Sequence, residues 1–93
     1  MNDTPVIGIV GSAGAYGRWL TRWLHDTLAI DALGSDPADP ASLAPQALVD
    51  RCDVLVFSAP VRISAGLIAD YARLAGDRAH HQLWMDLTSI KAA

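Results

Sequence analysis

The chain has 93 residues, 52% of them hydrophobic and 18% charged, and its formal net charge is -3 at pH 7. This length fits one small domain with a packed core, and the composition is not that of a disordered chain. The acidic balance and the scattered Lys and Arg residues argue against a general affinity for nucleic acid or for an anionic membrane.

The single cysteine, Cys52, excludes an internal disulfide and a Cys-rich metal site, so we expect no metal. The N-terminus lacks the basic start and the long apolar stretch of a secretory signal. The apolar run at residues 6–10 is far too short to cross a bilayer. We therefore expect a cytoplasmic protein with no membrane partner.

The first elements are a strand and a helix. Residues 6–10 form a continuous, β-branched apolar run that is typical of a strand buried in a parallel sheet. From residue 15 the period becomes helical, which predicts an amphipathic helix through Trp19, Leu20, Trp23, Leu24 and Leu28. We expect the two tryptophans to pack in the core or at an interface.

Three more strands follow, separated by helices. Residues 28–33 predict a weaker second strand, and three prolines within residues 36–45 predict a loop. A short helix is expected at residues 45–51, a strand at 53–58, a helix at 63–74 and a last strand at 82–87.

This alternation predicts one domain over residues 1–93, an α/β Rossmann-like three-layer fold. We expect a short parallel sheet of about four strands in the order 2-1-3-4, with helices on both faces. Ligands of such sheets bind in the crevice at the carboxyl ends of the strands.

A glycine-rich turn lies between the first strand and the first helix. Its spacing is G-x-x-G-x-x-G, because Ser12 stands where the common G-x-G-x-x-G pattern has its first glycine. Such turns bring backbone N–H groups and a helix N-terminus against a pyrophosphate. The alternative is a turn that merely connects strand to helix. The predicted cofactor-binding residues here are Gly11, Ser12, Ala13, Gly14, Ala15, Tyr16 and Gly17.

An acidic residue, Asp36, follows the second strand. A carboxylate there accepts hydrogen bonds from the adenosine ribose hydroxyls and repels a 2′-phosphate, which favours NAD over NADP. Alternatively Asp36 is a turn residue before proline, or Gly34 or Ser35 occupies the key place if the strand ends earlier.

Two further segments end at the same edge of the sheet. Ser58, Ala59 and Pro60 follow the third strand, where they either touch the cofactor or only terminate the strand. Thr88 and Ser89 follow the last strand, where they either reach the nicotinamide or form a polar loop.

Taken in order, these motifs resemble the N-terminal domain of prephenate dehydrogenases. They are I-G-I-V-G at residues 7–11, G-A-Y-G-R at 14–18, L-G-S-D at 33–36, D-V-L-V-F-S-A-P-V at 53–61 and D-L-T-S-I-K at 86–91. Many related dehydrogenases share the first of these motifs and the strand motif. The ending D-L-T-S-I-K is the more specific piece.

The resemblance implies NAD-dependent oxidative decarboxylation of prephenate or arogenate in tyrosine biosynthesis. It implies that Ser89 lies beside the nicotinamide and a catalytic histidine, so Ser89 is the predicted catalytic residue. That histidine follows the S-I-K segment in the family, and His25, His80 and His81 do not match it. We therefore expect the catalytic and dimerisation helical domain to lie outside these 93 residues, so that prephenate or arogenate binds only when that domain is supplied.

Two other functions fit the same residues. One is a stand-alone, non-catalytic NAD(H)-binding or sensing module, and the other is a degenerate nucleotide-binding fold used as an assembly surface. An exposed last strand also favours a partner, of which a second copy in a homodimer is one.

Overall fold

The computed structural model describes residues 4–87. Its elements alternate along the chain as the sequence predicts. They are β1 (Ile7–Val10), α1 (Ala15–Leu28), β2 (Leu33–Ser35), α2 (Pro45–Arg51), β3 (Val54–Phe57), α3 (Val61–Ala75), the 3-10 helix η1 (Gly76–His81) and β4 (Leu83–Asp86).

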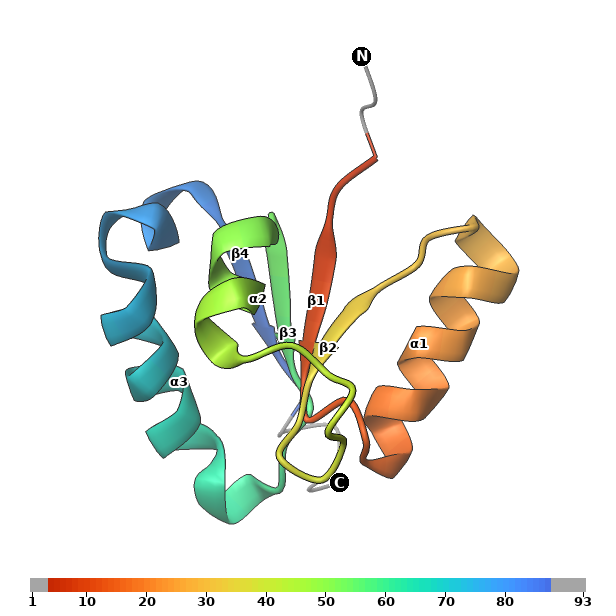
Figure 1. Cartoon of the computed structure of the whole chain (residues 1–93), viewed down its shortest axis with the longest axis horizontal. Coiled ribbons are helices and arrows are strands. Elements are labelled where there is room, and N and C mark those ends of the chain that lie inside the picture. Colours follow the sequence, from red (N-terminus) through yellow and green to blue (C-terminus); the bar gives the residue numbers. More distant parts are fainter. Residues whose placement is uncertain (1–3, 88–93) are drawn as a thin grey trace.

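The four strands form one parallel sheet in the order β2-β1-β3-β4, which confirms the predicted topology. Helix α1 covers one face of the sheet, and α2 and α3 cover the other (Figure 1). The predicted three-layer Rossmann-like fold is therefore confirmed. No helix among residues 4–87 is long and apolar enough to cross a membrane.

The second strand is displaced from its predicted position at residues 28–33. Helix α1 continues through Leu28 and ends at Ala29, which has a left-handed backbone (φ 54°). The amide of Ile30 then donates to the carbonyl of Leu24, six residues back, in a Schellman-type closure. These apolar residues therefore end the helix, and β2 begins only at Leu33.

The main core lies between the sheet and the helices α2 and α3. Phe57 of β3 is its central aromatic residue, with its ring 5.4 Å from Tyr71 and 5.3 Å from Trp84. Gly8 of β1 makes room for α2, because a Cβ there would lie 2.5 Å from the sulfur of Cys52. Cys52 is fully buried, and burial raises its thiol pKa to about 11, so the thiol stays protonated.

The tryptophans of α1 do not join this core. Trp19 and Trp23 stack on each other, with ring centroids 6.4 Å apart, and both are exposed. Of the two predicted alternatives, packing in the core is therefore wrong for the described chain, and packing at an interface stays a prediction. Helical spacing identifies an apolar stripe but does not show whether anything covers it.

Candidate functional site

The carboxyl ends of the four strands meet at one edge of the sheet, where the glycine turn follows β1. Gly11 has a left-handed backbone (φ +87°), and a Cβ there would lie 3.1 Å from backbone atoms of Ser58 and Ala59. Its amide donates to the carbonyl of Ser35 at 2.9 Å, and its carbonyl accepts from the amide of Gly14 at 3.1 Å. The turn is thus fixed against the ends of β2 and β3, in a conformation that only glycine adopts cheaply.

The last glycine of the motif brings α1 close to the turn. A Cβ at Gly17 would meet the Gly11 carbonyl oxygen and would lie 2.9 Å from the Cα of Ser12. These contacts involve backbone atoms, which cannot move aside by changing rotamer. The absence of a side chain at Gly17 therefore lets the first turn of α1 pack directly against the glycine turn.

The N-terminus of α1 is open. Among the described residues, the amides of Ala15, Tyr16 and Gly17 have no hydrogen-bond acceptor, and the first helical bond runs from Arg18 to the Gly14 carbonyl. No side chain caps the helix, and no acidic residue lies in its first turn. The positive end of the helix dipole therefore faces outward with free donors, which suits an anion.

Ser12, the irregular residue of the motif, lies against β2. Its Cβ and Oγ occupy the space that a side chain at Gly34 would need, each 2.6 Å from a Cβ built there. Ser12 also lines a hollow of about 790 Å³ between α1 and the segments 31–34 and 39–43, together with Arg18 and Arg22. The only sequence signal that Arg18 and Arg22 lie together on this side of α1 was their i, i+4 spacing.

Asp36 lies next to the glycine turn, 23 residues away from it in sequence. Its Oδ2 accepts the amide of Ala13 at 2.9 Å, and its Oδ1 accepts the amide of Ala38 at 2.9 Å. Ser42 fixes the following loop by bonding both the amide and the carbonyl of Asp36. The carboxylate is therefore held beside the glycine turn, and each oxygen keeps a lone pair for a further donor.

The segment after β3 packs against the glycine turn at the carboxyl ends of the strands. Ser58 and Ala59 are buried, whereas Pro60 is exposed and occupies the N-cap position of α3. The amide of Ser58 donates to the Val10 carbonyl, and its buried hydroxyl has no hydrogen-bond partner within residues 4–87. Of these three predicted residues, only Pro60 presents an open surface.

The last strand reaches the same edge. The amide of Leu87 donates to the Phe57 carbonyl at 3.0 Å, so pairing with β3 continues to the crevice. Ser89 and Thr88 lie outside the described residues. His80 and His81 end η1 at the amino end of β4, away from the crevice.

The fold has counterparts in solved structures. Pyrroline carboxylate reductase from Plasmodium falciparum, solved with NADP bound, matches 95% of the chain at 14% identity and a TM-score of 0.72. Aspartate semialdehyde dehydrogenase II from Vibrio cholerae matches 94% of the chain at 16% identity and a TM-score of 0.60. The chain spans only 35% and 29% of these two proteins.

The fold is thus a Rossmann-like α/β fold, which this chain shares with both solved enzymes. No protein-family model matches the sequence, and no curated protein matches it. Neither of the two solved structures is a prephenate dehydrogenase, so the family resemblance stays a hypothesis.

Proposed function

We propose that this chain is the NAD-binding domain of a dehydrogenase that acts on prephenate or arogenate. The observation that supports NAD binding is that the glycine turn, the uncapped N-terminus of α1 and the carboxylate of Asp36 lie next to one another. These three features have the chemistry of a dinucleotide site, with donors for the pyrophosphate and an acceptor for the ribose.

The residues present fit a dinucleotide. Gly11 and Gly17 stand where no Cβ can be placed without a close contact, and Gly14 is exposed at the start of α1. The free amides of Ala15 and Tyr16 would donate to the pyrophosphate oxygens, with the helix dipole favouring their negative charge. A backbone cradle of this kind needs no cationic side chain.

Asp36 would select the ribose. Its rigid carboxylate would accept the 2′- and 3′-hydroxyls, and its charge would repel a 2′-phosphate, which favours NAD over NADP. When bound, the nicotinamide accepts a hydride from the substrate. Pro60 and Ser89 would border the nicotinamide at the carboxyl ends of the strands, with Ser89 as the proposed catalytic residue. We also propose that the protein acts in the cytoplasm.

Calorimetric titration with NAD, NADH, NADP and NADPH tests the cofactor assignment. We expect NAD to bind more tightly than NADP. Asp36→Asn should weaken NAD binding by about tenfold, or about 1.4 kcal/mol, and should bring the affinities for NAD and NADP closer together. Asp39→Asn is the matched control, because Asp39 lies in the same loop and also accepts a backbone amide, that of Ala41. Absence of binding by all four nucleotides would refute the proposal.

The substrate assignment needs the full-length polypeptide that the gene encodes. We expect NADH to form from NAD when prephenate or arogenate is added, and Ser89→Ala to slow this reaction. NAD binding without prephenate- or arogenate-dependent NADH formation would overturn the substrate assignment. It would leave the dinucleotide site intact and favour an NAD(H)-sensing module.

A further inference from the structure

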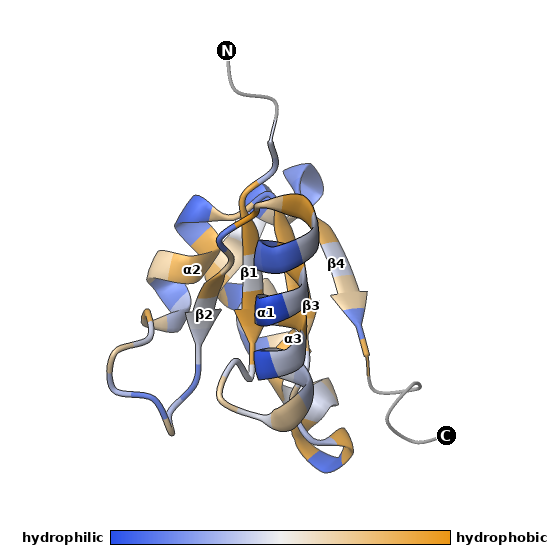
Figure 2. Ribbon diagram, turned by 90° about the vertical axis from the view of Figure 1, so that its right-hand side faces the viewer, coloured by the Kyte–Doolittle hydropathy of each residue, from blue (hydrophilic) through white to orange (hydrophobic). Residues whose placement is uncertain are grey.

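The loop that follows β2 is closed on itself by backbone hydrogen bonds. The amide of Leu43 donates to the carbonyl of Gly34 at 2.9 Å, which brings the two ends of the loop together. Within the loop, the amide of Asp39 donates to the Asp36 carbonyl, and the amide of Ser42 donates to the Asp39 carbonyl, both at 3.0 Å. Figure 2 shows this loop running out from the end of β2 before the chain returns to α2. Two consecutive turns thus bring Ser42 back beside Asp36.

The hydroxyl of Ser42 makes three polar contacts inside this loop. It accepts the amide of Asp36 at 3.0 Å, and it lies 3.0 Å and 2.8 Å from the carbonyl oxygens of Asp36 and Asp39. A hydroxyl has one proton to donate, so this proton is shared between the two carbonyls. Both polar backbone groups of Asp36 are therefore bonded to one half-buried side chain.

The Asp36 amide depends on this side chain. Within residues 4–87, the Ser42 hydroxyl is the acceptor that the amide has, whereas the Asp36 carbonyl also accepts the amide of Asp39. Removal of the hydroxyl would leave a half-buried amide without an acceptor, which is more costly than the loss of an exposed hydrogen bond. The backbone at Asp36 would then reorient to reach water.

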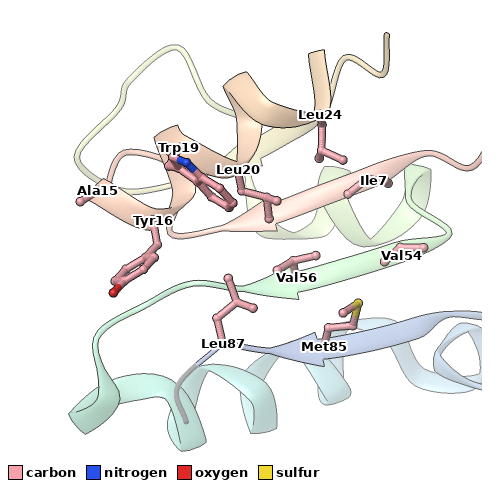
Figure 3. A pocket seen from close by; sticks show the side chains of 10 residues that line it. All are labelled: Ile7, Ala15, Tyr16, Trp19, Leu20, Leu24, Val54, Val56, Met85 and Leu87. Carbon is pink, nitrogen blue, oxygen red and sulfur yellow. The ribbon is translucent and has the colours of Figure 1, made fainter. Parts of the chain in front are cut away.

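Side chains of α1 do not hold Asp36 in place. Arg18 and Arg22 line the hollow between α1 and this loop, but neither forms a hydrogen bond or an ion pair in the described part of the chain. Tyr16 and Trp19 line an apolar pocket on the other flank of α1, beside β3 (Figure 3). The support of Asp36 therefore comes from its own loop and from the glycine turn.

The carboxylate of Asp36 connects this loop to the glycine turn. Its Oδ1 accepts the amide of Ala38 and its Oδ2 accepts the amide of Ala13, both at 2.9 Å. Because the backbone orientation of Asp36 decides where its Cβ points, a change at Ser42 would displace the carboxylate relative to Ala13. The effect of Ser42 on the glycine turn thus passes through Asp36.

We propose that Ser42 is the positioning residue for Asp36, and that its hydroxyl strengthens the preference of this domain for NAD over NADP. The inference rests on the proposed dinucleotide site, in which Asp36 accepts the ribose hydroxyls. Hydrogen bonds to those hydroxyls require the carboxylate oxygens in fixed directions, whereas repulsion of a 2′-phosphate depends mainly on charge and distance. Loss of the Ser42 hydroxyl should therefore weaken NAD binding while NADP stays repelled.

Calorimetric titration of Ser42→Ala with NAD and NADP tests the proposal. We expect NAD binding to weaken about fivefold, the usual effect of one lost hydrogen bond, and NADP binding to change by less than twofold. Ser42→Thr keeps the hydroxyl and should restore NAD binding to within about twofold of the wild type. Thr21→Val is the matched control, because the Thr21 hydroxyl lines the same hollow but bonds the Gly17 carbonyl within α1.

The double variant Asp36→Asn/Ser42→Ala shows whether Ser42 acts through Asp36. In the Asp36→Asn background, Ser42→Ala should weaken NAD binding by less than about twofold. Amide hydrogen exchange, measured by NMR without nucleotide, gives a second observable. The Ala13 amide should exchange at least about threefold faster in Ser42→Ala and at the wild-type rate in Ser42→Thr. The Gly14 amide, which donates to the Gly11 carbonyl, should keep its rate in both variants.

Circular dichroism shows whether each variant is folded, and the binding data then separate the possible outcomes. Equal weakening of NAD and NADP binding by Ser42→Ala would overturn the proposal, because Ser42 would then only stabilise the loop. NAD binding that Ser42→Ala leaves unchanged would also overturn it, and would leave the proposed dinucleotide site intact. Absence of binding of either nucleotide to the wild-type chain would instead refute the proposed function, and the selectivity role of Ser42 together with it.

Discussion

Gly17 and Gly66 are both helical glycines, but substitution by alanine should have opposite effects at the two positions. In a helix interior, alanine is favoured over glycine by about 1 kcal/mol. At Gly66 of α3 a new Cβ would meet nothing within 4 Å, so Gly66→Ala should stabilise the protein by about this amount. At Gly17 the same gain is opposed by contact with backbone atoms of Gly11 and Ser12.

The size of this opposing effect decides the sign at Gly17. Overpacking costs about 1–3 kcal/mol, and the cost should lie near the upper end here because both contacts are with backbone. We therefore expect Gly17→Ala to destabilise the protein by about 2 kcal/mol. Since 1 kcal/mol shifts the Tm of a domain this small by about 4–8 °C, the two variants should differ in Tm by well over 10 °C.

Thermal unfolding followed by circular dichroism measures both variants under the same conditions. Dinucleotide titration provides a second observable, because pushing α1 away from the turn would also displace the free amides of Ala15 and Tyr16. Gly66→Ala should leave that affinity unchanged. If Gly17→Ala raised the Tm as much as Gly66→Ala does, the reasoning about close packing at the turn would be refuted.

Three further outcomes follow from the described contacts. Phe57→Ala should lower the free energy of unfolding by about 3–5 kcal/mol in urea titrations, since Phe57 is 1% exposed and fills the core; a loss below about 1 kcal/mol would contradict this. The hydrogen bond of His25 to Asp31 raises the His25 pKa above 6.5. The contribution of this bond to the stability of the fold is therefore full below about pH 6.5 and is lost as the pH rises through the folded-state pKa. The Tm difference between wild type and His25→Gln should therefore shrink from pH 5 to pH 9, and a constant difference would argue against it. Cys52 should resist alkylation at pH 8 in the folded protein and react readily in denaturant, because burial raises its pKa to about 11.

The topology could be predicted from the sequence because each strand and helix has its own periodicity. Residues 53–58 are too short and too apolar for a surface helix, and the 63–74 stripe recurs only at helical spacing. The start of β2 could not be predicted, because Leu28 and Ile30 are equally apolar in a strand and at a helix end. Only the left-handed turn at Ala29 distinguishes the two, and alanine gives no signal for it.

The candidate site was also predictable from the sequence only in part. The proximity of Asp36 to the glycine turn followed from strand order, since β1 and β2 are neighbours whose carboxyl ends coincide. The backbone amides that bind its carboxylate, those of Ala13 and Ala38, have no side-chain signature. The exposure of Trp19 could not be predicted from the sequence either, because the number of helices that cover a sheet face depends on tertiary structure.

The contact between Ser12 and Gly34 changes how the irregular glycine motif is understood. Where the turn passes β2 there is room for only one side chain. In this chain Ser12 of the turn has the side chain, and Gly34 of β2 has none. The glycine that the turn lacks is thus replaced by a glycine 22 residues later, on the adjacent strand. Gly34→Ala should therefore be tolerated far better together with Ser12→Gly than alone. Glycine turns of this kind can then be recognised from two segments together, even where the glycine spacing within one segment departs from G-x-G-x-x-G.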